Sequence, residues 1–121
     1  MATAENDPTP YLPLSPAVFH VLVSLGDADR HGYAIIKDIA ERTEGEVRLG
    51  AGTLYAIVKR LLDDGLIVEL PGSSADSDDQ RRRYYRLTAL GRRVARAEVE
   101  RLEHAAALAR STRLFGRMRP T

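Results

Sequence analysis

Apolar residues recur with helical periodicity in three segments of the first half of the chain. The segment after Ser15 is apolar nearly all round and predicts a helix central to the core, whereas residues 32–43 divide into an apolar and a charged face. Residues 51–64 give the clearest helical pattern, and a very short strand is expected just before them at 47–49. The apolar positions of this third helix are Leu54, Ile57, Val58, Leu61 and Leu62.

Capping signals mark the ends of these predicted helices. Ser15 can accept a hydrogen bond from the first-turn N–H groups, and Pro16 has a backbone angle already suited to a helix. Glycine in the left-handed conformation commonly follows the last turn of a helix. The three helices are therefore expected to end at Gly26, Gly45 and Gly65.

The apolar period then changes to that of strands. Residues 66–70 and 81–87 predict two strands, and the Gly-, Ser- and Asp-rich residues 71–80 predict the turn of a hairpin between them. Thr88 can cap a last helix over about residues 89–114. Helices joined by a connection longer than the turn of a simple helix-turn-helix, followed by a hairpin, outline a winged helix.

The predicted fold class is therefore mainly α with a small β-hairpin, a winged helix-turn-helix followed by a long C-terminal helix. Residues 1–14, rich in proline, are expected to form a flexible N-terminal arm. The winged-helix domain is assigned to residues 15–88, and the C-terminal dimerisation helix and tail to residues 89–121. A length of 121 residues suits one such domain and excludes two full domains.

Composition narrows the classes of function. The chain has no cysteine and three scattered histidines, which excludes a disulfide framework, a zinc–thiolate site and a thiol nucleophile and leaves no cluster of metal ligands. No apolar run approaches the roughly 18 residues that span a bilayer. The first ten residues contain none of the basic residues of a secretory signal. These features predict a soluble cytoplasmic protein with no membrane partner.

The formal net charge of +1 conceals a strong polarity along the chain. Residues 1–80 contain 6 Lys and Arg against 14 Asp and Glu, whereas residues 81–121 contain 12 Arg against 3 Glu. Such asymmetry indicates an anionic partner, for example nucleic acid. A solvated arginine-rich helix gives the same pattern, so the charge distribution alone leaves both interpretations open.

One side of the third predicted helix is free of large apolar residues. Small residues there allow close approach to a DNA groove, and basic residues can reach phosphates or base edges. A helix start that contains glycine also presents N–H groups to which a phosphate can bind. The alternative is an ordinary amphipathic surface helix. The positions concerned are Gly50, Gly52, Ala56, Lys59, Arg60 and Asp63.

The second strand of the predicted hairpin carries the most concentrated positive charge. Strand alternation puts neighbouring side chains on opposite faces, and Tyr85 and Leu87 are expected to point inward. The arginines at the base of the hairpin, Arg81, Arg82 and Arg83, are then expected to lie along a phosphate backbone. They can also neutralise the acidic residues at positions 76–79, and both roles can hold together.

The last predicted helix has small and apolar residues at alternating spacings of three and four, the seam of a short coiled coil. A second copy of the chain is the simplest partner for this seam, and the alternative is that the helix folds back on its own domain. The seam consists of Ala95, Val99, Leu102, Ala106 and Ala109.

Catalysis finds little support, because the sequence contains no serine-nucleophile elbow, zinc-protease motif or dinucleotide fingerprint. His31 is expected to start a helix or to pack rather than to act as a general base. His20 is expected to be a core histidine whose hydrogen bonds are satisfied. We assign no catalytic residue, metal site or cofactor, and expect the protein not to be an enzyme.

Three segments together match a known family. They are His-Gly-Tyr at residues 31–33, Gly-Thr-Leu-Tyr at 52–55 with the Lys-Arg pair that follows, and Arg-Arg-Tyr-Tyr-Arg at 82–86. In this order they resemble the PadR family of bacterial transcriptional regulators, over about residues 14–110. The resemblance implies a winged-helix homodimer that dimerises through its C-terminal helix, reads operator DNA with its third helix and is released by a small-molecule effector.

Carried over to this chain, the resemblance places Thr53 and Tyr55 near DNA, and Arg82 and Arg83 at the wing. Ala56 stands where the family often has proline, and alanine suits a helix better. The acidic residues at 76–79 depart from a basic hairpin tip and argue against insertion of that tip into a minor groove.

The sequence therefore predicts a ligand-responsive repressor that binds an inverted-repeat operator in double-stranded DNA as a homodimer. The alternative is a winged-helix module that binds an acidic protein and has lost sequence-specific DNA binding, which the acidic hairpin tip and the acidic first 80 residues favour. The DNA-binding candidates are Gly52, Thr53, Tyr55, Lys59, Arg60, Arg81, Arg82 and Arg83. The dimerisation candidates are Val99, Leu102, Ala106 and Ala109.

Overall fold

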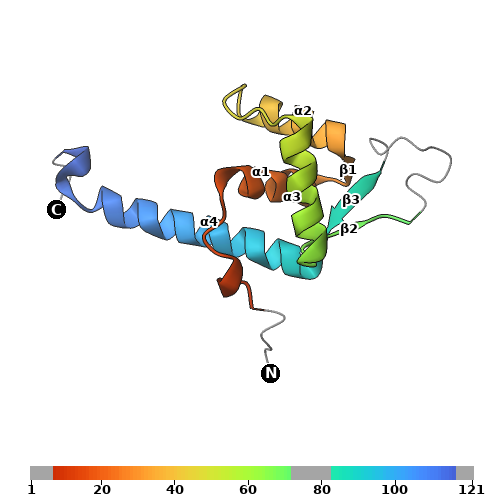
Figure 1. Cartoon of the computed structure of the whole chain (residues 1–121). Helices are drawn as coiled ribbons and strands as arrows, with labels where there is room; N and C mark the ends of the chain where they lie inside the picture. The colour runs from red at the N-terminus through yellow and green to blue at the C-terminus, as the bar shows by residue number, and fades with distance from the viewer. Residues whose placement is uncertain (1–6, 72–82, 117–121) are drawn as a thin grey trace.

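The computed structural model describes residues 7–71 and 83–116, and the predicted fold class, mainly α with a small sheet, is confirmed. The first three helices gather around one core, and the fourth passes beside the first before it projects away from the rest (Figure 1). The helices are α1 (Pro16–Asp27), α2 (Gly32–Arg42), α3 (Ala51–Asp63) and α4 (Ala89–Arg110).

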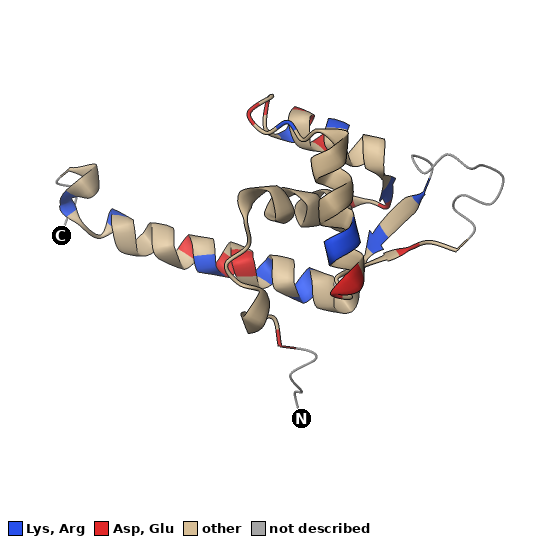
Figure 2. Cartoon of the chain, viewed as in Figure 1, with Lys and Arg blue, Asp and Glu red and all other residues tan. Residues whose placement is uncertain are grey.

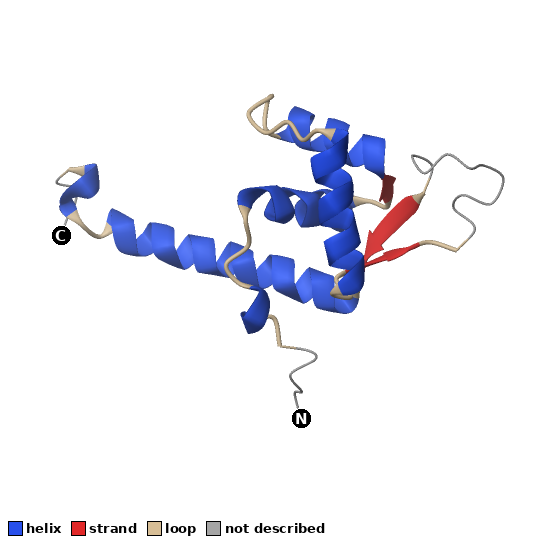
Figure 3. Cartoon of the chain, in the orientation of Figure 1, coloured by secondary structure: helices blue, strands red, loops and turns tan. Residues whose placement is uncertain are grey.

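The sheet lies beside α3 and has three antiparallel strands in the order β1-β3-β2, with β1 next to the start of α2 and β2 near the end of α3 (Figure 3). Strands β2 (Ile67–Glu69) and β3 (Tyr84–Leu87) pair as predicted for the hairpin. Strand β2 is shorter than expected and β3 begins after residue 83, while residues 72–82, with most of the predicted turn and the start of the expected second strand, lie outside the described residues. Strand β1 (Arg30–His31) was not predicted from the sequence, and it pairs with the edge of β3 opposite β2.

The strand expected at residues 47–49 was wrong, because these residues form an irregular connection between α2 and α3. No neighbouring strand of the described sheet pairs with them. Instead the Val47 N–H donates to the Thr43 hydroxyl at 3.0 Å, and the side chains of Val47 and Leu49 are half-buried against the core. Their apolar character reflects this packing.

Most of the predicted helix ends are confirmed. The Ser15 hydroxyl accepts from the Val18 N–H at 3.2 Å, and the Thr88 hydroxyl accepts from the Gly91 N–H at 2.9 Å. Gly45 and Gly65 are left-handed, with φ of 85° and 77°. Gly26 does not end α1, which continues to Asp27 without a left-handed residue.

Two further expectations about the helices are corrected. Helix α4 ends at Arg110 rather than near residue 114, because Ser111 and Thr112 turn back and bond the last-turn carbonyls of Leu108 and Ala109. A short 3-10 helix, η4 (Arg113–Phe115), follows. His20 is half-exposed on α1 rather than buried in the core.

The core joins all four helices to the hairpin and encloses few polar side chains. Helix α1 lies at the centre of this core, as predicted. Among the described residues, no helix is long and apolar enough to cross a membrane. The fully enclosed residues include Val21, Leu22, Ile35, Ile39, Leu54, Leu61, Leu66, Ile67 and Val94.

The described part of the predicted N-terminal arm packs on the protein, in contrast to the flexible arm expected over residues 1–14. A short 3-10 helix, η2 (Thr9–Tyr11), lies near α4, and Tyr11, Leu12 and Leu14 are half-buried against the core. Glu98, only 2% exposed, accepts a hydrogen bond from the Leu14 N–H. This carboxylate therefore connects the N-terminal segment to α4.

Arg101 neutralises Glu98 through a bidentate contact, with Nε at 2.7 Å and Nη2 at 2.8 Å from the two carboxylate oxygens. These hydrogen bonds lower the pKa of Glu98, against the opposite effect of burial. A carboxyl group whose pKa is lowered by folding stabilises the protein above its unfolded pKa, about 4.3, and loses that effect as the pH falls through the folded pKa.

Glu98→Gln is therefore expected to lower the free energy of unfolding by about 2 kcal/mol at pH 7 and by much less at pH 3, because the charged hydrogen bonds exist only in the ionised state. Urea unfolding at the two pH values measures the difference. The exposed neighbour provides the control, since Glu100→Gln is expected to change stability little at either pH. A loss at pH 3 as large as that at pH 7 would contradict this role of the charge.

Candidate nucleic-acid interface

Helix α3 buries one side and exposes the other, as its sequence predicts. Leu54, Val58 and Leu61 are buried in the core. The opposite side carries side chains that are small or basic, and those of Lys59 and Arg60 are 78% and 75% exposed. The exposed candidates Gly52, Thr53, Ala56, Lys59 and Arg60 thus lie on one face.

The start of α3 is open. Gly50 is the N-cap residue and offers no side-chain cap, so the first-turn N–H groups receive no hydrogen bond from it. A Cβ at Gly50 or Gly52 would meet nothing within 4 Å. These glycines are therefore not required by packing inside the chain, and they leave the helix start accessible to an approaching backbone.

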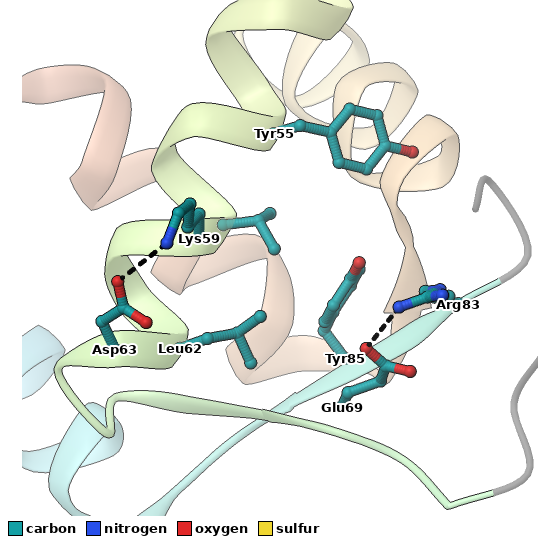
Figure 4. Close-up of a pocket in the computed structure, with 8 residues that line it drawn as sticks. Tyr55, Lys59, Leu62, Asp63, Glu69, Arg83 and Tyr85 are labelled. Carbon is teal, nitrogen blue, oxygen red and sulfur yellow. Dashed lines mark hydrogen bonds and ion pairs between the residues drawn. The ribbon is translucent and has the colours of Figure 1, made fainter.

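Tyr55 points away from the exposed face. Its ring extends toward α2 and β1 (Figure 4), where the hydroxyl touches Gly32 so closely that a Cβ at position 32 would overlap it. Two of the sequence motifs, His-Gly-Tyr and Gly-Thr-Leu-Tyr, are thus joined by packing, since a glycine at the start of α2 admits the tyrosine of α3. The structure places Tyr55 as a half-buried side chain that orients α3.

The hairpin presents alternate residues of β3 to the core and to solvent. Tyr85 and Leu87 are buried, which confirms the predicted inward face. Tyr84 is exposed and packs edge-on against the ring of His31, at 5.2 Å between centroids. His31 caps α2 by accepting from the Ala34 N–H at 3.1 Å, which confirms its predicted role at a helix start.

Only part of the arginine cluster lies in the described residues. Arg83 is half-exposed, and its Nη1 lies 3.4 Å from Glu69 Oε1 on the neighbouring strand. Arg81 and Arg82 lie outside the described residues, as do the acidic residues at 76–79. Of the described basic candidates, the structure brings Lys59 of α3 and Arg83 beside β3 to one cavity, whereas Arg60 lies next to Lys59 in the sequence and does not line it.

A cavity of about 420 Å³ separates α3 from the hairpin (Figure 4). The Tyr85 ring rises from its floor toward Tyr55, and burial followed by the nearby Glu69 carboxylate raises the pKa of Tyr85. Ion pairs occupy opposite sides of the rim. The lining residues are Tyr55, Val58, Lys59, Leu62, Asp63, Glu69, Arg83 and Tyr85.

Helix α4 leaves its distal half without cover in the described chain. Val99 and Leu102 on the predicted seam are 38% and 42% exposed, and Leu108 beside the seam is 58% exposed. Ala106 is exposed and Ala109 half-buried. Beyond Glu98, α4 thus presents an apolar stripe that the described residues leave largely exposed.

The described residues contain no group of three or more His, Asp or Glu side chains that could hold a metal ion. The candidate site consists of a helix face, a hairpin edge and a stripe of α4 that the described residues leave exposed.

Comparison with known proteins decides the family. A model described as the transcriptional regulator PadR-like family matches residues 21–97, from α1 to the middle of α4. The chain belongs to this family. The resemblance expected from the three motifs is thereby confirmed.

Solved structures share the fold of this PadR-like chain. A transcriptional regulator from Clostridium thermocellum is 24% identical, with a TM-score of 0.65 and an alignment that covers 92% of this chain and 97% of that one. RosR of H. salinarum is 28% identical, with a TM-score of 0.58 and coverage of 80% and 78%. Among curated protein sequences, an uncharacterized protein X of Lysinibacillus sphaericus is 38% identical over 66 residues, which are 54% of this chain and 59% of that protein. The matched part of this chain thus spans less than two thirds of the length of that relative.

Proposed function

We propose that this PadR-like regulator is a cytoplasmic homodimeric repressor, which binds double-stranded DNA at an inverted-repeat operator and is released by a small-molecule effector. The observation that carries the proposal is the exposed face of α3, which combines small residues with Lys59 and Arg60 while the opposite face is buried. The release by a small-molecule effector is proposed because the chain belongs to the PadR-like family. The proposal needs no cofactor and assigns no catalytic residue.

In this proposal α3 enters the major groove, which is wide enough for one α-helix. Gly52 and Ala56 allow close approach, Thr53 and the first-turn N–H groups bind phosphate, and the basic pair reaches phosphates or base edges. Arg83, with Arg81 and Arg82 before it in the sequence, follows the phosphate backbone from the hairpin. Tyr55 acts indirectly, because it fixes α3 against Gly32.

The apolar stripe of α4 supports the dimer. Exposed Val99, Leu102 and Leu108 can be buried by the same stripe of a second copy, around a twofold axis. Two symmetric copies of α3 then fit half-sites separated by about one helical turn of DNA, roughly 34–36 Å.

The test uses a duplex that the protein selects from a random pool. Lys59→Ala/Arg60→Ala is expected to lower affinity for that duplex about 10- to 50-fold and to flatten the slope of log affinity against log salt by up to about 2 units, because two phosphate or base contacts are lost. Lys37→Ala, which removes one exposed cation from α2, is the control and is expected to leave both quantities close to those of the wild type.

Two results would contradict the proposal. An unchanged affinity and salt slope in Lys59→Ala/Arg60→Ala would remove α3 from the interface. If wild-type protein enriched no duplex at all, the alternative function, a winged-helix module that binds an acidic protein, would take its place.

A further inference from the structure

Each described cation on the proposed DNA-facing elements, α3 and the β2–β3 hairpin, already has a carboxylate partner. On α3, Lys59 Nζ lies 3.3 Å from Asp63, and Arg60 Nε lies 3.9 Å from Asp64. Both partners follow one helical turn later. Figure 2 shows the basic positions of α3 with acidic ones directly after them, at the end of the helix.

The hairpin repeats the arrangement. Arg83 pairs with Glu69 across the two strands, and Arg86 donates two hydrogen bonds, of 3.1 and 2.8 Å, to Asp29 in the α1–β1 connection. The hydrogen bonds from Arg86 lower the pKa of Asp29 despite the opposing effect of desolvation. The described basic side chains of α3 and the hairpin are thus held in locally neutral pairs.

Asp63 and Asp64, at the end of α3, are placed where a carboxylate adds little stability to the helix. Asp63 is its last residue and Asp64 its C-cap, where the partial negative charge of the helix dipole disfavours an anion. The order of each pair, cation first and carboxylate four residues later, is also the less favourable one on a helix. The side chains are 67% and 38% exposed, so neither fills a space in the core.

We propose that Asp63 and Asp64 are specificity-determining residues for the DNA binding proposed above, on which this inference rests. DNA of unrelated sequence attracts the protein through phosphate charge alone. The pairs Lys59–Asp63 and Arg60–Asp64 have no net charge, so they add little to this attraction. At the operator, base-edge contacts draw Lys59 and Arg60 out of their pairs. The aspartates therefore weaken binding to unrelated DNA more than binding to the operator, which widens the difference in affinity on which specificity depends.

Asp63→Asn/Asp64→Asn tests the proposal, because asparagine keeps the size of the side chain and removes its charge. Affinity for an unrelated duplex is expected to rise about fivefold at 0.1 M salt. The slope of log affinity against log salt for that duplex is expected to steepen by about 1–2 units, since two cations become available to phosphates. The ratio of operator to unrelated affinity is expected to fall. Thermal unfolding is expected to be unchanged or slightly later.

The control is Glu100→Gln/Glu103→Gln, which changes the net charge equally on the part of α4 that leads away from α3 (Figure 1). A fall in the affinity ratio no larger than that of the control would overturn the proposal. Fluorescence anisotropy with both duplexes gives the ratio and the slopes. Failure of the proposed DNA binding gives a different result from failure of the specificity role, because wild-type protein would then select no operator from the pool. The specificity role would be rejected together with the DNA binding in that case.

Discussion

Gly91→Ala is expected to destabilise the protein by about 3 kcal/mol, although alanine favours a helix over glycine by about 1 kcal/mol. Gly91 lies in the first turn of α4, and a Cβ there would overlap the backbone carbonyl of Leu66, which precedes β2. The same carbonyl accepts the Thr88 N–H at 3.0 Å, and the Thr88 hydroxyl bonds Gly65 O at 2.7 Å. A methyl group must therefore separate α4 from the base of the hairpin.

Urea unfolding of Gly91→Ala beside Gly52→Ala measures this effect. Gly52 also lies in the first turn of a helix, but a Cβ there meets nothing within 4 Å, so Gly52→Ala is expected to gain about 0.5–1 kcal/mol. The two substitutions are thus expected to have opposite signs. Gly91→Ala as stable as the wild type would show that the α3–β2 junction does not need this close approach.

Leu102→Arg is expected to convert the protein to a monomer and to lower operator affinity more than about 100-fold, because a single copy engages only one half-site and loses the effective concentration that links the two. Leu102 is 42% exposed in the middle of the apolar stripe of α4. An arginine there brings two like charges together across the twofold axis. The single chain is expected to stay folded, since the described residues leave this side chain 42% exposed.

Light scattering and operator binding, measured together, check this expectation. His104→Arg adds a cation on α4 away from the seam, at an exposed position, and is expected to remain dimeric with unchanged affinity. Dimeric Leu102→Arg with wild-type affinity would place the interface elsewhere.

The locally determined features were predictable from the sequence. The apolar stripe of α3, the Ser15 and Thr88 caps and the inward face of Tyr85 each depend on a short segment and on side chains within it. The position of the hairpin after the third helix and the three family motifs were likewise recognisable from short segments of the sequence. Together they were sufficient to assign the winged helix and to select the exposed face of α3.

Features that depend on distant segments were not predictable. Strand β1 has two residues, too few for a strand pattern, and exists because β3 offers a free edge to it. The packing of residues 7–14 depends on Glu98, which reads in the sequence as one more charged residue of an exposed helix. The contact of Tyr55 with Gly32 likewise joins motifs that the sequence shows only as separate.

The structure changed the interpretation of the charge pattern most. The sequence showed an acidic first part and a basic last part, whereas the structure shows acidic and basic side chains paired one by one on α3 and the described hairpin. Helical spacing of four residues was a signal for the pairs that involve Asp63 and Asp64. The ion pairs that involve Glu69 and Asp29 could not be predicted from the sequence, because their arginine partners lie 14 and 57 residues away along the chain.

Selection of duplexes from a random pool by wild-type protein, together with the mass of the complex, shows whether the protein binds operator DNA as a symmetric dimer. We expect an inverted repeat whose half-sites are about one helical turn apart, bound by two copies of the chain. An enriched sequence without twofold symmetry, bound by one copy, or no enriched sequence at all would contradict it.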